Sequence, residues 1–95
     1  MEEEKQPQSI DVLEVLSMMA DQLASICWAK LGLQPDPISG TLALNLEQAR
    51  IAIDAFASLA PVLKSQLSTQ DQASVDNIVR DLKLNYVSKS KEAKG

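Results

Sequence analysis

The sequence contains no histidine. This absence removes the most common general base, the most common metal ligand and every catalytic triad that uses an imidazole. The three glycines are isolated and no Gly-Lys-Ser/Thr motif occurs, which excludes a phosphate-binding loop. The carboxylates are mostly spread at the spacing of a helix surface, so paired-carboxylate catalysis is disfavoured. We therefore expect a protein that is not an enzyme, with no catalytic residue, no cofactor and no metal site.

Cysteine is almost as scarce, because Cys27 stands alone and no intramolecular disulfide can form. Its thiol has two interpretations, a redox or interchain-disulfide site and a small buried apolar group. We favour the second, since Cys27 lies among apolar residues at helical spacing and buried thiols are inert. A lone thiol fits a reducing compartment, and the acidic start of the sequence lacks the order of a signal peptide. We expect a cytoplasmic protein.

Basic residues are outnumbered, with 9 Lys and Arg against 13 Asp and Glu, and the net charge is −4. An acidic protein repels phosphate backbones and anionic lipid headgroups, so we expect neither a nucleic-acid partner nor a membrane. The most apolar stretch, residues 10–31, is long enough to cross a bilayer. It carries Asp21 near its middle, however, and a charge at the centre of a bilayer costs about 2.5–3.5 kcal/mol.

Aromatic residues make up only 3% of the chain, so the core must be built from aliphatic side chains. Abundant alanine with little glycine favours helices over sheets and predicts an all-α fold. The length of 95 residues fits one domain. We expect a disordered acidic lead at 1–8, a single helical domain at 9–88 and a flexible basic tail at 89–95.

Three helices are predicted, at about 10–31, 46–66 and 69–88. Ser9 is the expected N-cap of the first helix, and Gly32 can adopt the left-handed conformation that ends it. The segment 34–40 cannot continue a helix, because it contains two prolines and a glycine. We expect the second and third helices to form an antiparallel hairpin, with the first helix packed across both.

Capping residues mark the other two helices. Asn45 is the expected N-cap of the second helix, and Gln48 completes a capping box with it. Ser68 and Thr69 are the expected caps of the third helix. Pro61 removes a backbone hydrogen bond inside the second helix. We therefore predict either a kink near Pro61 or a separate last turn that begins there.

Apolar residues recur on the second and third helices with the period of a helix. On the second helix their spacing of 3, 4, 3, 4, 3 and 4 residues is an unbroken heptad seam: Leu46, Ala49, Ile53, Phe56, Ala60, Leu63 and Leu67. The third helix has a narrower stripe: Val75, Ile78, Val79, Leu82 and Tyr86. These patterns predict the core.

The first helix has more apolar surface than the other two, because its apolar arc covers about half of its circumference. Two neighbouring helices could cover that arc, but Ile10, Met18 and Trp28 lie outside it. Ile51 and Val62 extend the apolar zone of the second helix along one flank. These five residues are the candidate interface, since large exposed apolar groups mark binding surfaces. The alternatives are that single exposed apolar residues are ordinary, and that Trp28 packs on the loop at 35–37.

The order of these features resembles a known family. It consists of Leu31-Gly32, a proline-containing loop, Asn45-Leu46-x-x-Ala49, Ile53-Asp54, Leu59, Leu63, Leu67-Ser68 and a last helix that ends near Tyr86-Val87. Over about residues 10–88 this order is similar to a bacterial family of small proteins known as domain of unknown function 1844. The resemblance implies a helical cytoplasmic protein and supplies no activity and no catalytic residue.

Taken together, the patterns favour a non-enzymatic helical interaction or scaffold protein. We expect it to self-associate through apolar helix faces as a homo-oligomer, or to bind a helical protein partner, because a small domain often completes its core in this way. The alternative is a protein that binds a small apolar ligand in a pocket between the first two helices. Met18, Met19 and Trp28 would suit such an adaptable pocket.

Overall fold

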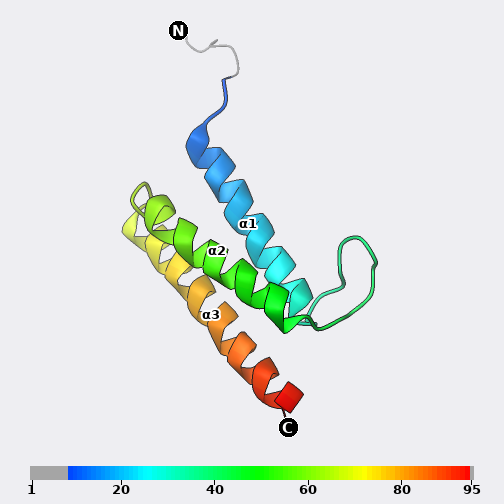
Figure 1. The fold of residues 1–95 in the computed structure, drawn as a ribbon. Helices are drawn as coiled ribbons and strands as arrows, with labels where there is room; N and C mark the ends of the chain where they lie inside the picture. Colours follow the sequence, from blue (N-terminus) through cyan, green and yellow to red (C-terminus); the bar gives the residue numbers. More distant parts are fainter. Residues whose placement is uncertain (1–8, 95) are drawn as a thin grey trace, which may run out of the picture.

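The computed structural model describes residues 9–94, and the predicted acidic lead lies outside this range. Three helices make up the fold: α1 is Val12–Lys30, α2 is Leu46–Lys64 and α3 is Thr69–Lys94. Successive helices run in opposite directions, with α2 between α1 and α3 (Figure 1). The all-α three-helix prediction is confirmed. The prediction that the first helix packs across both others is wrong in part, because α1 packs along α2 and scarcely touches α3.

The start of α1 differs from the prediction. The N-cap is Asp11 and not Ser9, since an oxygen of the Asp11 carboxylate accepts the backbone N–H groups of Leu13 at 2.9 Å and Glu14 at 3.4 Å. A carboxylate satisfies these N–H groups and also interacts favourably with the positive end of the helix dipole. Ile10 therefore precedes the helix instead of belonging to its first turn.

The end of α1 follows the prediction at Gly32, whose φ is +78°. Its N–H donates to the carbonyl of Ala29 at 3.0 Å, and the N–H of Leu33 donates to the carbonyl of Trp28 at 3.0 Å. These two bonds form a Schellman motif, which satisfies carbonyls that the helix end would leave without a partner.

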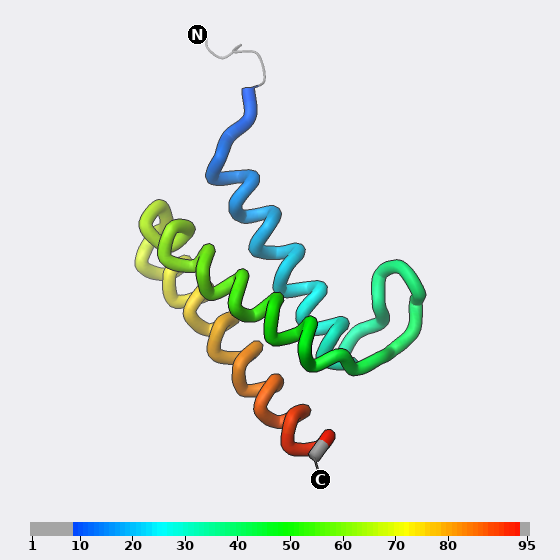
Figure 2. The backbone as a smooth tube through the Cα atoms, in the orientation of Figure 1, coloured from blue at the N-terminus to red at the C-terminus, as the bar shows by residue number. Residues whose placement is uncertain are grey.

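The loop between α1 and α2 returns to the point where it leaves α1 (Figure 2). Leu44 forms an isolated antiparallel bridge with Leu31, and the N–H of Asn45 donates to the carbonyl of Lys30 at 2.7 Å. The loop thus joins the C-terminal end of α1 directly to the N-terminal end of α2. This short closure fixes the two helices side by side.

The N-cap of α2 is Asn45, as predicted, with its side-chain oxygen accepting the N–H of Gln48 at 3.1 Å. The capping box is only half formed, because the N–H of Asn45 is used by the carbonyl of Lys30. The helix runs through Pro61 as one element and ends at Lys64, two residues earlier than predicted. Pro61 therefore does not begin a separate turn.

The third helix begins after Ser68, whose hydroxyl accepts the N–H of Asp71 at 3.2 Å, so Ser68 alone is its cap. It continues to Lys94 and includes residues 89–94, which the sequence assigned to a tail. An ion pair between Lys89 and Glu92 at 3.6 Å, one turn apart, lies in this last segment. Each such pair stabilises an exposed helix by about 0.2–0.5 kcal/mol.

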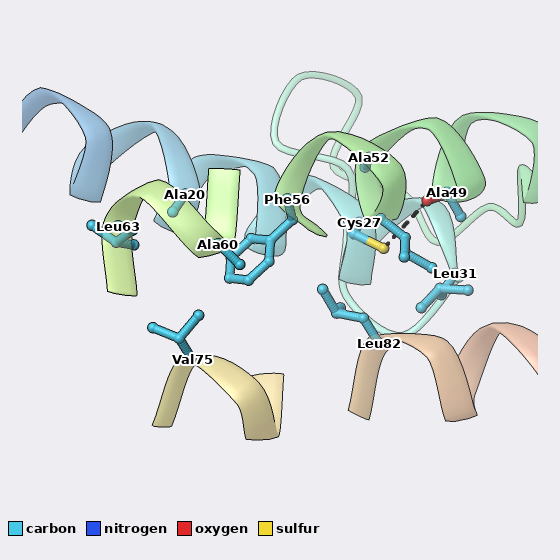
Figure 3. Close-up of a cluster of buried hydrophobic side chains, with 11 residues drawn as sticks. Ala20, Cys27, Leu31, Ala49, Ala52, Phe56, Ala60, Leu63, Val75 and Leu82 are labelled. Atoms are coloured by element: carbon cyan, nitrogen blue, oxygen red, sulfur yellow. Dashed lines mark hydrogen bonds between the residues drawn. The ribbon is translucent and has the colours of Figure 1, made fainter. Parts of the chain in front are cut away.

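The core forms where all three helices contribute side chains to the predicted seam of α2 (Figure 3). Three side chains are completely buried and lie together there: Cys27 of α1, Leu31 at the end of α1, and Leu82 of α3. The remaining buried members of the cluster are Ala20, Ala49, Ala52, Ile53, Phe56, Ala60, Leu63 and Val75. The heptad seam of α2 and the stripe of α3 are thus confirmed as the core.

Candidate functional site

The position of α3 leaves one flank of α1 uncovered. Most of the apolar arc of α1 has only α2 beside it, because α3 packs on the other side of α2 and reaches α1 only near Cys27 and Leu31. Four members of the arc consequently remain exposed: Val12 at 69%, Val15 at 39%, Met19 at 45% and Ile26 at 37%. Their spacings of 3, 4 and 7 residues place them along a single stripe of the helix surface.

The neighbouring flank of α2 adds Ile51, which is 57% exposed, and Val62, which is 54% exposed. Ile26 and Ile51 line one shallow groove between the two helices, with a volume of about 270 Å³. Val12 and Val62 line a second groove of about 300 Å³ near the other end. We call the exposed apolar residues of these adjoining flanks the α1/α2 face: Val12, Val15, Met19, Ile26, Ile51 and Val62.

The five candidate interface residues do not all lie on this face. Ile51 and Val62 do, on the same flank of α2. Ile10 is 82% exposed and precedes α1, while Met18 is 68% exposed on the outer side of α1. Trp28 is partly buried and packs against the core. The structure therefore brings two of the five together and places the other three elsewhere.

A match to a known family covers the whole of this face. A model described as "Domain of unknown function (DUF1844)" matches residues 12–88, which span α1, α2 and most of α3. The chain belongs to this family. No curated protein and no solved structure matches the chain. Every residue of the α1/α2 face thus lies inside the DUF1844 domain.

Three residues of the face in this DUF1844 domain were not predicted to be exposed, Val12, Val15 and Ile26, and Met19 was predicted only as part of the alternative ligand pocket. They were placed in the covered part of the apolar arc of the first helix. The signal that could have found them is the width of that arc, since half a helix circumference requires two neighbours to cover it. The sequence pattern did not show that α1 would have one neighbour along most of its length.

The thiol of the DUF1844 domain is buried inside the core. Cys27 has no exposed surface, and its Sγ donates a hydrogen bond to the carbonyl of Ala49 at 3.6 Å (Figure 3). Burial raises the pKa of the Cys27 thiol to about 11. The thiolate, which is the nucleophile and metal-binding form, is therefore scarce at neutral pH.

Acidic and sulfur side chains of the DUF1844 domain do not converge on a metal site. Within residues 9–94, no three of the potential Cys, Asp and Glu ligands lie close enough together to hold an ion. Among the described residues one helix, α1, is long and apolar enough to cross a membrane by length and composition, and 17% of its apolar window is buried; the core helix of a soluble protein, which is mostly buried, and a signal sequence also pass this test.

Proposed function

We propose that this DUF1844 chain is a non-enzymatic interaction protein that self-associates by packing the α1/α2 faces of two copies together. The observation that supports this function is the set of apolar side chains along the adjoining flanks of α1 and α2, each between 37% and 69% exposed: Val12, Val15, Met19, Ile26, Ile51 and Val62. Monomeric soluble proteins rarely leave such contiguous apolar surface in water, and where it occurs it commonly marks an interface.

The apolar surface is large enough to support a dimer of modest affinity. Burying a Val, Ile or Met side chain completely contributes about 1.5–3 kcal/mol, so the half that is still exposed in each of these residues represents about 1 kcal/mol. Six residues in each of two copies then contribute on the order of 10 kcal/mol. Association costs roughly 4–15 kcal/mol. At the lower end of that cost about 6 kcal/mol remains, which corresponds to a dissociation constant of tens of micromolar, so we expect a weak dimer.

A two-fold axis is the natural arrangement, because a single surface on each copy must then be complementary to itself. In such a dimer each substitution occurs twice. Ile51→Asp removes an apolar contact and buries a carboxylate in both copies, and we expect dimerisation at least about a hundredfold weaker, equivalent to about 2.7 kcal/mol.

The matched control is Ile38→Asp, which makes the same chemical change at a side chain that is 95% exposed in the loop. Sedimentation equilibrium at tens of micromolar would measure both variants beside the wild-type chain. We expect the wild-type chain and Ile38→Asp to dimerise and Ile51→Asp to remain monomeric. A wild-type chain that sediments as a pure monomer overturns the proposed function.

The second candidate function is the binding of a small apolar ligand between α1 and α2. The two grooves of about 270 and 300 Å³ favour it, since they lie between the first two helices as expected, although Met18, Met19 and Trp28 line neither groove. These volumes are at the lower limit of typical ligand sites, which occupy about 300–1,000 Å³. Native mass spectrometry separates the two functions. A ligand mass that copurifies with the chain supports binding, whereas integer multiples of the chain mass support self-association.

The proposed partner is a protein, and not a membrane or a nucleic acid, in the cytoplasm. Two exposed acidic side chains of α1, Glu14 and Asp21, oppose insertion of that helix into a bilayer. The net charge of −4 opposes association with phosphate backbones. Both properties leave an apolar protein surface as the complementary partner for the α1/α2 face.

A further inference from the structure

The opposite side of α2 carries a second hollow, between α2 and α3. It has a volume of about 520 Å³, and small or apolar groups of α2 form its floor, among them Ala57, Ala60 and Pro61. The basic side chains of Lys64, Arg80 and Lys83 line its edges. We call this hollow the α2–α3 groove. Because small residues floor it, a side chain from outside can enter it.

The α2–α3 groove is positively charged in a protein that is negatively charged overall. Lys64 lies 2.7 Å from the carboxylate of Asp76, the one acidic residue that lines the groove. Arg80 contacts Asp81, which lies outside the groove, at 3.6 Å. The lining residues alone therefore comprise three cationic side chains and one carboxylate, with Lys64 and Arg80 each already in an ion pair, and this excess of cations favours an acidic partner surface.

The outer side of α1 has the complementary pattern. Glu14, Met18 and Asp21 are spaced 4 and 3 residues apart, so they form one stripe of the helix, here called the acidic stripe. All three are exposed, and Met18 projects 68% of its surface into solvent between the two carboxylates. The stripe lies outside the α1/α2 face, and a copy that uses that face for dimerisation still presents it.

The two patterns also match in length. Glu14 and Asp21 are seven residues apart, which corresponds to about 10 Å along a helix. Lys64 lies beside Asp76, and Lys83 is seven residues beyond Asp76 on α3, again about 10 Å. An incoming carboxylate can therefore meet Lys83 at one end of the groove and, in exchange for its bond to Asp76, Lys64 at the other. Met18 then lies over its apolar floor, which suits a flexible thioether side chain.

We propose that the acidic stripe of one copy docks into the α2–α3 groove of a second copy. This contact joins two different surfaces, so it is head-to-tail and can link dimers formed by the α1/α2 face into larger assemblies. Its charged pairs lie near the surface, which makes it sensitive to salt. Dimerisation through the apolar face does not depend on charge, and the two contacts are therefore separable by experiment.

Charge reversal tests the contact on the full chain. The variants are Glu14→Lys/Asp21→Lys in the stripe and Arg80→Glu/Lys83→Glu in the groove. Sedimentation velocity is measured at about 0.01 M and about 1 M salt, where the screening length is roughly 30 Å and 3 Å. We expect the wild-type chain to form species larger than a dimer only at low salt. Each double variant should weaken this association at least about tenfold, since attraction becomes repulsion.

The matched control is Glu47→Lys/Asp54→Lys, because Glu47 occupies the first turn of α2 as Glu14 occupies that of α1. It changes the net charge equally but should leave the large species intact. Circular dichroism of each variant verifies its helix content.

Combining the two reversals restores complementarity. The variant with all four substitutions has the net charge of the wild-type chain, and an equimolar mixture of the two double variants pairs a basic stripe with an acidic groove. We expect the large species to return in both samples. The proposal is overturned if the wild-type chain shows no such species at low salt, if a double variant retains them, or if neither combination restores them. None of these outcomes affects a salt-resistant dimer.

Discussion

Replacing Leu82 with alanine should detach α3 from the rest of the protein more effectively than any change on its surface. Leu82 is completely buried and meets Cys27 and Leu31, so it joins α3 to the end of α1 as well as to α2 (Figure 3). Truncation of a buried leucine costs about 2–5 kcal/mol, because the cavity that it leaves collapses only in part. The total stability of a domain this small is about 5–14 kcal/mol. We expect Leu82→Ala to lower the melting temperature by at least about 8 °C.

The same helix offers a matched control in Leu84, which is 61% exposed only two residues away. Leu84→Ala makes the identical chemical change, and its effect should stay within about 0.5 kcal/mol. Urea unfolding followed by circular dichroism measures both free energies. It should be performed in the Ile51→Asp background, since self-association would add stability through mass action. Equal losses for the two variants, or a loss below about 1 kcal/mol for Leu82→Ala, would refute the packing of α3 described above.

Two further predictions concern the thiol and a helix cap. A thiol-specific reagent at pH 8 should label Cys27 at least about 100-fold more slowly in the folded chain than in urea, since a pKa raised from 9.0 to about 11 lowers the thiolate fraction by that factor before burial adds to it. Rapid labelling without denaturant would contradict the buried position. Asn45→Ala should lower the free energy of unfolding by about 1 kcal/mol, whereas Asn45→Asp, which keeps the accepting oxygen, should lower it less. Equal losses for the two substitutions would show that the cap bond contributes little.

Local chemistry determined the features that the sequence predicted correctly. The seam of α2 could be predicted because an unbroken heptad spacing places its residues on one face of a helix. The structure confirms it, since the central members Ala49, Ile53 and Phe56 are buried. Gly32 and Asn45 were readable for a similar reason, since each end of a helix leaves backbone groups that only a few residue types can satisfy. None of these inferences required knowledge of which helices are neighbours.

The start of α1 and the end of α3 differ from the prediction, and each difference has a local chemical cause. Ser9 and Asp11 are both good N-caps, and the carboxylate of Asp11 won because it reaches two N–H groups. Residues 89–94 contain lysine, glutamate and alanine, which are strong helix formers, and no glycine or proline ends α3 before them. Their basic composition suggested a solvated tail, but their helix propensity favours continuing α3, which runs to Lys94.

The candidate site depended on helix arrangement, which the separate patterns did not contain. The seam of α2 serves two neighbours: its flank with Ile51 borders α1, and its opposite flank with Ala57 and Pro61 borders α3. Because α1 and α3 both pack on the seam of α2, α2 can cover only part of the apolar surface of each. The apolar stripe of α3 is narrow enough to be buried in this way, whereas the apolar arc of α1 is too wide. The exposed residues Val12 and Met19 follow from that mismatch, and the dimer that we propose would cover them with the same surface of a second copy.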